Sequence, residues 1–142
     1  MALFKVGNVS VFVRTRKEHC PPHVHAECPD GWEARFTFSY LNEEVDFWDF
    51  PKKPKKTPTT QDLNVVCHAV HQHLVKCRAR FWAVVGDICL RNKRIILSSD
   101  GAATVSSPRK RGGIQVVEGS YDSARQEVTI HLADGTHQII SP

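Results

Sequence analysis

The sequence predicts an α+β protein, in which an antiparallel β-meander packs on one amphipathic helix and a small, β-hairpin-rich C-terminal segment follows. Three observations predict this fold class. Short stretches of alternating apolar and polar residues follow one another, between turn residues, up to residue 50. Apolar residues three and four positions apart then extend over residues 59–86. Alternation returns near the C-terminus on both sides of Asp134-Gly135, a strong hairpin signal.

Four strands are expected in the meander. The first is indicated by Val9, Val11 and Val13, which occupy alternate positions. Pro21 and Pro22 forbid helix and hold the chain extended as it enters the second strand. Pro-Asp-Gly at 29–31 and Asn-Glu-Glu at 42–44 supply the following turns. The predicted strands cover residues 4–14, 23–28, 32–38 and 45–50.

One helix is expected after a loop rich in lysine and proline. Thr59 or Thr60 can cap its start, and Asp62 suits its first turn. Gly86 is a plausible end, because glycine readily adopts the left-handed conformation that closes a helix. The helix would press one apolar stripe against the sheet, made of Val66, Cys67, Val70, Leu74, Cys77, Phe81 and Val84.

The character of the chain changes after Asp87. Short apolar runs at 88–90 and 94–97 precede a polar, basic linker at 106–113, near which we expect a boundary. The predicted strands beyond it cover 114–117, 127–133 and 136–140. We therefore expect a meander-plus-helix domain over 1–87 that carries the histidines, short strands and a basic linker over 88–113, and a β-hairpin segment over 114–142.

Length and composition limit the class of protein. The 142 residues are 41% hydrophobic, enough for one domain, or one domain with an appendage, to build a core without staples. Apolar runs stay well short of the roughly 18 residues that span a bilayer. The first residues lack the features of a signal peptide, so we expect a cytoplasmic protein with no membrane partner.

Cysteine usage predicts free thiols. The five cysteines are odd in number and form no C-x-x-C pair, which argues against a disulfide framework and against a four-cysteine zinc site. We expect most of them to be buried, with Cys20 as the exception because it lies among histidines. The cysteines are Cys20, Cys28, Cys67, Cys77 and Cys89.

Positive charge is bunched along the chain, whose formal net charge is +4. Basic blocks lie at 52–56, 91–94 and 109–111. Such clusters attract polyanions such as RNA or DNA, and they also occur as solvated loops that keep a protein soluble; both interpretations stay open. The residues that we expect to contact nucleic acid are Lys52, Lys53, Lys55 and Lys56.

The chemistry of the chain is concentrated in three histidines within seven residues. His23 and His25 share one face of a predicted strand, with their Cβ atoms about 7 Å apart, and His19 can reach them across the prolines. Converging imidazoles form either a transition-metal site, for zinc, nickel, copper or iron, or an acid/base pair that works near neutral pH. Cys20 or Glu27 lies near enough to complete a ligand set.

A structural role for the same histidines, in capping and packing, is the third interpretation. A second group lies on the predicted helix, where His68 and His71 share a face and His73 points elsewhere. These three flank the apolar stripe, and we interpret them as residues of the surface or of the sheet edge.

The run His-Cys-Pro-Pro-His-Val-His at 19–25 resembles the signature His-x-Pro-Pro-His-x-His of a small bacterial family, the domain-of-unknown-function family numbered 4160. The resemblance covers about residues 5–84, with Cys20 in the variable position of the motif. It implies that His19, His23 and His25 are the residues that matter. It also implies a unit that is often a complete protein and stops after the helix.

The tail at 120–142 resembles the first hairpin of a second family, the domain-of-unknown-function family numbered 2442, through Leu-Ala-Asp-Gly and a closing apolar-Ser-Pro. Genes of the two families commonly adjoin in an arrangement that looks like a toxin and antitoxin pair. The resemblance therefore implies a fusion or a truncated remnant of two genes. It also implies an antitoxin or another protein as partner.

Three functions follow as hypotheses. The first is a toxin-type protein that acts on RNA or another phosphate-bearing target, with His23, His25 and His19 as catalytic residues and the lysines of 52–56 holding the substrate. The second is a non-catalytic module whose histidines bind a transition metal such as zinc, or an anion. The third is a small protein-interaction domain. The sequence leaves open whether the protein is an enzyme.

Overall fold

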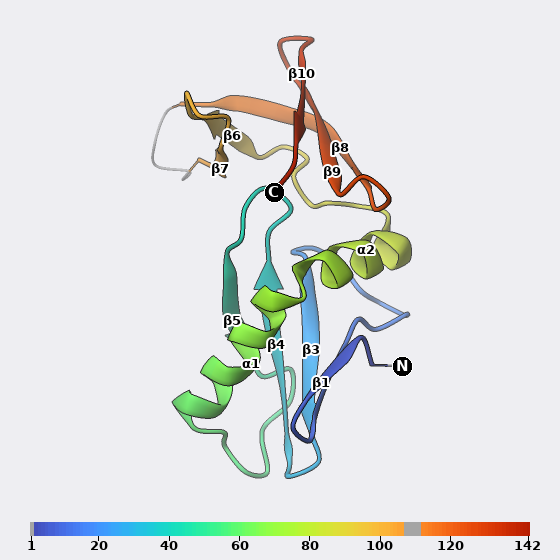
Figure 1. Ribbon diagram of the computed structural model, residues 1–142, viewed down its shortest axis with the longest axis vertical. Coiled ribbons are helices and arrows are strands. Elements are labelled where there is room, and N and C mark those ends of the chain that lie inside the picture. Colours follow the sequence, from blue (N-terminus) through green and yellow to red (C-terminus); the bar gives the residue numbers. More distant parts are fainter. Residues whose placement is uncertain (1, 107–111) are drawn as a thin grey trace.

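The computed structural model describes residues 2–106 and 112–142 and contains two antiparallel five-stranded sheets and two helices (Figure 1). The α+β class is therefore confirmed. The elements are β1 (Phe4–Val6), β2 (Val9–Phe12), β3 (His23–Cys28), β4 (Trp32–Phe38), β5 (Val45–Asp49), α1 (Thr60–Gln72), α2 (Leu74–Val85), β6 (Arg94–Leu97), β7 (Ala103–Val105), β8 (Ile114–Asp122), β9 (Glu127–Leu132) and β10 (His137–Ile140).

The N-terminal sheet is a meander in the order β1-β2-β3-β4-β5. The expected meander is confirmed, but its first strand is not a single strand over 4–14. Gly7 adopts a left-handed conformation (φ 59°), and the chain turns there into a β1–β2 hairpin that pairs Phe4 with Val11. The alternating valines are compatible with either arrangement, because each half of the hairpin keeps the period of two.

The two faces of this sheet differ in chemistry. Val11, Ala26 and Ala34 are register partners on one face, which is apolar, and the helices cover that face (Figure 1). His25 pairs with Arg35 on the opposite face, which also carries Glu33. The meander thereby separates an apolar core from a row of polar and titratable side chains.

The helical region begins and ends where expected but is interrupted. Thr59 caps α1, since its Oγ1 accepts from the amide of Asp62 (3.1 Å) while Asp62 Oδ2 accepts from the amide of Thr59 (2.9 Å). Gly86 closes α2 in the left-handed conformation. The prediction of one continuous helix is wrong, because His73 leaves the helical conformation (φ −117°, ψ 25°).

One local and one tertiary contact of His73 accompany the break. Its Nδ1 hydrogen-bonds the carbonyl of Ala69 (2.8 Å), and its ring stacks on Phe4 at 4.1 Å between centroids. Two shorter helices can follow the twisted sheet, with α1 against β5 and α2 against β3. Among the described residues, no helix is long and apolar enough to cross a membrane.

The second sheet has the order β10-β9-β8-β6-β7 and lies beyond α2 (Figure 1). The hairpin at Asp134-Gly135 is confirmed, with Leu132 donating to the carbonyl of Thr136 (2.9 Å). Strand β7 was not predicted. Of the predicted basic linker, Arg109, Lys110 and Arg111 lie outside the described residues, whereas the strands on either side of it join this one sheet. Independent folding of residues 1–87 stays a prediction.

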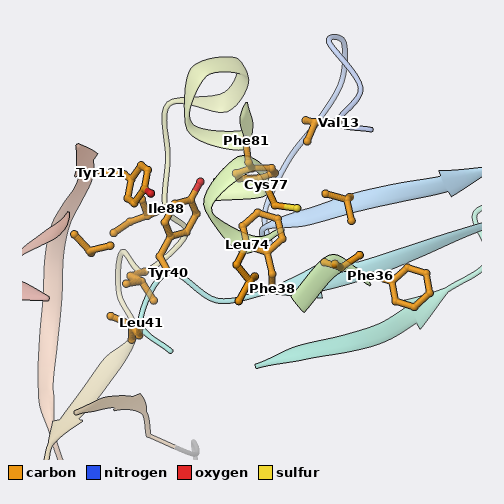
Figure 2. Close-up of a cluster of buried hydrophobic side chains, with 14 of the residues drawn as sticks. Val13, Phe36, Phe38, Tyr40, Leu41, Leu74, Cys77, Phe81, Ile88 and Tyr121 are labelled. Carbon is orange, nitrogen blue, oxygen red and sulfur yellow. The ribbon is translucent and has the colours of Figure 1, made fainter. Parts of the chain in front are cut away.

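A shared core joins the two sheets (Figure 2). Tyr40, from the connection that leaves β4, packs on Tyr121 of β8 with ring centroids 5.2 Å apart. Its hydroxyl donates to the carbonyl of Arg78 (2.6 Å), and burial raises the pKa of this phenol. The buried guanidinium of Arg78 donates to the carbonyls of Ser39 (2.9 Å) and Asn42 (2.6 Å). These bonds attach the β4–β5 connection to α2.

Candidate metal centre

His23 and His25 lie next to each other at the start of β3, as the alternation of a strand requires. Their ring centroids are 5.2 Å apart, and the residues are only 1% and 4% exposed. Phe12 stacks on His25 from the neighbouring strand, and Trp48 and Phe81 pack edge-on against His23. Aromatic side chains therefore exclude water from both imidazoles.

The connection between β2 and β3, residues 13–22, folds over the histidines; we call it the covering loop. Arg14 of this loop pairs with Glu33 of β4 at 2.6 Å. Glu18 turns its carboxylate inward, with 6% of its side chain exposed. Its Oε2 lies 2.7 Å from His23 Nε2, and its Oε1 lies 3.2 Å from His25 Nε2. One carboxylate thus bridges the two imidazoles.

The outer nitrogens of both rings are held by acceptors. His23 Nδ1 lies 2.7 Å from the carbonyl of Pro21, and His25 Nδ1 lies 3.2 Å from Glu33 Oε2. A carbonyl or carboxylate oxygen can only accept, so Nδ1 carries the proton in each neutral ring. Both Nε2 atoms then direct a lone pair at Glu18.

Three electron-pair donors consequently face one point. Glu18 Oε2 is buried, and within the described part of the chain its polar contact is the one with His23 Nε2. Single ligand atoms of Glu18, His23 and His25 all lie within 4.8 Å of one another. Ligands about 2.05 Å from a shared metal ion are separated by about 2.9–3.4 Å in octahedral or tetrahedral geometry. The 3.2 Å between Glu18 Oε1 and His25 Nε2 lies in this range, and the 2.7 Å between Glu18 Oε2 and His23 Nε2 lies just below it.

Protonation gives a less complete account of the same contacts. Burial is the main cause that lowers the pKa of His23 below its ordinary value, although the Pro21 carbonyl and Glu18 act in the opposite direction. The neutral imidazole is therefore favoured. With the proton on Nδ1, the lone pair of Nε2 faces a carboxylate oxygen, and this contact is repulsive unless a proton or a metal ion lies between the two atoms. The donor set is suited to a metal ion.

A second layer of charge supports His25. Burial alone would raise the pKa of Glu33, but the hydrogen bonds and charges of Arg14 and His25 together outweigh burial and lower the pKa overall. Glu33 is thereby kept ionised beside His25. Carboxylates that hold the outer nitrogen of a metal-bound histidine fix its orientation and make the imidazole a stronger ligand.

Arg35 and Trp48 form a wall on the β5 side. The guanidinium of Arg35 lies 3.9 Å from the ring centroid of Trp48, and it pairs with Asp49 through Nε–Oδ1 (2.6 Å) and a second contact. The hydrogen bond from Arg35 holds the pKa of Asp49 below its usual value. Arg35 is therefore already neutralised by a carboxylate.

The structure distributes the three histidines of the motif unequally. His19 is exposed, with its ring 6.1 Å from that of His23 and its Nδ1 bonded to the carbonyl of Cys20 (2.8 Å). Glu18, rather than His19, supplies the third converging ligand atom. Glu27 is exposed and does not belong to this group of ligand atoms.

Cys20 forms a disulfide with Cys89, 69 residues away. The sequence argued against disulfides, and for this pair that prediction is wrong. Cys28, Cys67 and Cys77 are free thiols, and Cys28 and Cys77 are buried as expected. Sequence spacing carries no signal for such a bridge. The bridge arises because the covering loop and the turn after α2 meet in space.

The lysines of 52–56 do not contact the histidines directly. Lys52, Lys53 and Lys55 line a cavity of about 340 Å³ beside the β3–β4 turn, and Glu33 contributes to its wall. The amides of Lys55 and Lys56 donate to the carbonyl of Gly31, which anchors this loop at the turn. The loop thus lies at the far end of β3 from His23, behind the glutamate that supports His25.

The helix histidines lie elsewhere. His68 and His71 are exposed and, with Glu43, line a shallow cavity of about 650 Å³, in which His71 Nε2 lies 3.5 Å from Glu43 Oε2. Their interpretation as surface residues is consistent with this position.

Glu18, Glu33 and Arg14 are the site residues that sequence reasoning missed. Glu18 directly precedes His19, so its proximity to the motif was a usable signal. Glu33 becomes a neighbour of His25 only through the pairing of β3 with β4, which brings Arg35 opposite His25 and Glu33 opposite Glu27. That pairing follows from the turn at 29–31, which the sequence did indicate.

Comparison of the chain with family models, curated proteins and solved structures finds no match. The resemblances to the two families of unknown function accordingly stay predictions. The functional conclusion depends on the geometry of the centre.

Proposed function

We propose that the protein binds one divalent transition-metal ion, such as zinc, through Glu18, His23 and His25. One observation carries the proposal: three buried donor atoms, one from the covering loop and two from β3, converge on one point. At the same time, the Nδ1 atoms of both imidazoles are occupied by acceptors. Side chains that merely filled a core would not need a buried carboxylate facing two imidazole nitrogens.

The donor set indicates the class of metal. Two imidazoles and one carboxylate match the ligands of zinc and of ferrous iron, whereas magnesium prefers an all-oxygen shell with several waters. Three protein ligands leave a coordination position for water or another small ligand in a tetrahedral ion. The bound ion would lie beneath the covering loop.

The test is a zinc titration of the purified, metal-free full chain, followed by competition with a chromophoric chelator. We expect one zinc ion per chain and no binding of magnesium at the same concentrations. A stoichiometry of zero would contradict the proposal. Zinc that binds in several equivalents with weak affinity would indicate only adventitious contacts of exposed histidines.

Attack on RNA or another phosphate-bearing target, with an antitoxin as partner, stays a hypothesis. The lysine-lined cavity shares Glu33 with the centre, which supports it. The burial of His23 and His25 counts against direct acid/base chemistry, because a phosphodiester would reach the rings only after displacement of the covering loop. A metal ion bound between Glu18 and the two histidines would need no displacement of the covering loop.

Glu33 offers a test of how the centre is supported. Glu33→Gln preserves the size of the side chain but removes the charge that holds His25 Nδ1, so we expect zinc affinity to fall about 10-fold. Glu27→Gln is the matched control, since Glu27 is the register partner of Glu33 and is exposed. Equal zinc affinities for the two variants would show that Glu33 does not support the ligand.

A further inference from the structure

The disulfide between Cys20 and Cys89 lies next to the proposed metal centre. Cys20 is exposed and Cys89 is partly exposed, so a thiolate from solution can reach the bond. Cys89 follows the left-handed end of α2, and Asp87 Oδ1 accepts from its amide (2.7 Å). This turn holds Cys89 in position to meet the covering loop.

Cys20 is close in sequence to two parts of the centre. Glu18, the ligand from the covering loop, lies two residues before it. Pro21, whose carbonyl holds His23 Nδ1, is the next residue after it. A change in the position of Cys20 therefore acts both on a ligand and on the group that orients a second ligand.

The covering loop is anchored mainly at its two ends, where Val13 is buried and the carbonyl of Pro22 accepts from the amide of Phe38 (3.0 Å). Residues 14–17 are exposed, and Lys17 adopts a left-handed conformation (φ 60°). Arg14 anchors the start of the loop through Glu33, at a distance of 2.6 Å. Two residues after Glu18, the disulfide ties the covering loop covalently to the turn after α2.

We infer that Cys20 and Cys89 form a reversible redox site that controls how tightly the centre binds its metal ion. The inference rests on the proposed function. The disulfide form presents Glu18 in the position that bridges both histidines, and the dithiol form releases the loop that carries Glu18. A ligand that must be ordered during binding lowers affinity, because its conformational entropy is lost at that step.

The chemistry needs a small-molecule disulfide, such as oxidised glutathione, as oxidant. A thiolate of the pair attacks one sulfur of the oxidant, forms a mixed disulfide and releases one small-molecule thiolate. The second protein thiolate then attacks the mixed disulfide, closes the Cys20–Cys89 bond and releases the second small-molecule thiolate. Two electrons pass from the protein pair to the oxidant, and the two thiol protons pass to the released thiolates. Reduction by a small-molecule thiol runs the same steps in reverse.

The other cysteines are poorly placed for this reaction. Cys28 and Cys77 are buried, and burial raises the pKa of Cys77 to about 12. Cys67 is half-buried on α1, and its thiol contacts the carbonyl of Val45 (3.4 Å). A redox response of metal affinity is therefore assigned to the Cys20–Cys89 pair.

The experiment compares zinc affinity of the full chain in its oxidised form and after reduction, with the reductant removed under anaerobic conditions before titration. We expect reduction to weaken zinc binding at the centre about 10-fold, the size of effect seen when a group that positions a metal ligand is lost. Oxidised glutathione should restore the original affinity. Reduction also frees two thiols that can hold zinc together with Asp87, so the Cys20→Ser/Cys89→Ser double variant, which lacks both thiols, isolates the centre. It should bind zinc about 10-fold more weakly than the oxidised protein, whatever the redox state. Cys67→Ser is the control and should respond like the unaltered chain.

The outcomes separate the two proposals. Equal zinc affinity of the oxidised chain and the double variant would overturn the redox inference and leave the metal centre standing. Absence of zinc binding in both forms would overturn the proposed function and the inference with it.

A second measurement follows the loop without metal. We expect trypsin to cleave the reduced, metal-free chain after Arg16 or Lys17 several-fold faster than the oxidised chain, with the sites located by mass spectrometry. Equal cleavage rates would show that the disulfide does not hold the loop, and would overturn the inference even if the double variant failed to fold.

Discussion

Replacement of His25 by alanine is expected to weaken zinc binding by more than about 100-fold. Loss of a residue that only supports a ligand, such as Glu33, typically costs about 10- to 100-fold in metal affinity, and this variant removes a ligand itself. His23→Ala and Glu18→Ala should have effects of the same order, because each of the three residues supplies one of the converging atoms. Glu18→Gln refines the test: it keeps the shape of the side chain and removes its charge. The measurement is competition with a chromophoric chelator.

His68→Ala is the matched control for these variants. His68 is a histidine of the same chain, but it is exposed on α1 and lies outside the converging group. Its zinc affinity should equal that of the unaltered protein. Thermal unfolding of the metal-free variants separates loss of a ligand from loss of the fold. If His68→Ala were as damaging as His25→Ala, zinc would be binding elsewhere.

Replacement of Arg78 by alanine is expected to lower the free energy of unfolding by about 3 kcal/mol. The change leaves the carbonyls of Ser39 and Asn42 without their donor and removes a buried side chain. Burial lowers the pKa of Arg78, so part of the interaction energy offsets the cost of desolvating the guanidinium. Urea unfolding followed by tryptophan fluorescence measures the effect, and we expect the melting temperature to fall by about 10 °C.

Arg80→Ala is the corresponding control. Arg80 lies on the same helix, two residues further on, and is exposed, so its replacement should leave stability unchanged within error. A loss for Arg78→Ala no larger than that for Arg80→Ala would mean that the β4–β5 connection is held by its packing on Tyr121 rather than by the guanidinium. The stability lost in Arg78→Lys should lie between the losses for Arg78→Ala and Arg80→Ala, because one ammonium group cannot reproduce both donors of the guanidinium.

Local pattern was sufficient where an element depends on its own residues. The strands at 23–28 and 32–38 have the predicted bounds, because alternation and a Pro-Asp-Gly turn are both short-range signals. The cap at Thr59, the end at Gly86 and the hairpin at Asp134-Gly135 follow from single residues with specific backbone or hydrogen-bonding properties.

Pattern failed where tertiary contacts compete with it. The apolar stripe of the helical region continues through His73, yet its ring stacks on Phe4 and the helix divides there. Strand β7 is only three residues long, too short for a period to show, and it exists because β6 offers it an edge. The β1–β2 hairpin has the same alternation as one long strand, and only Gly7 marks the turn.

For the proposed centre, the sequence by itself determined that the chemistry lies around residues 19–25 and that His23 and His25 share a face. Both follow from residue type and the two-residue period of a strand. Only the tertiary structure decided the rest. In the structure Glu18, rather than the expected His19, supplies the third ligand atom. Glu33 contacts His25 and is paired with Arg14, and Cys20 is bonded to Cys89. Each of these contacts joins different segments of the chain, and strand register and loop closure, rather than local spacing, bring such segments together.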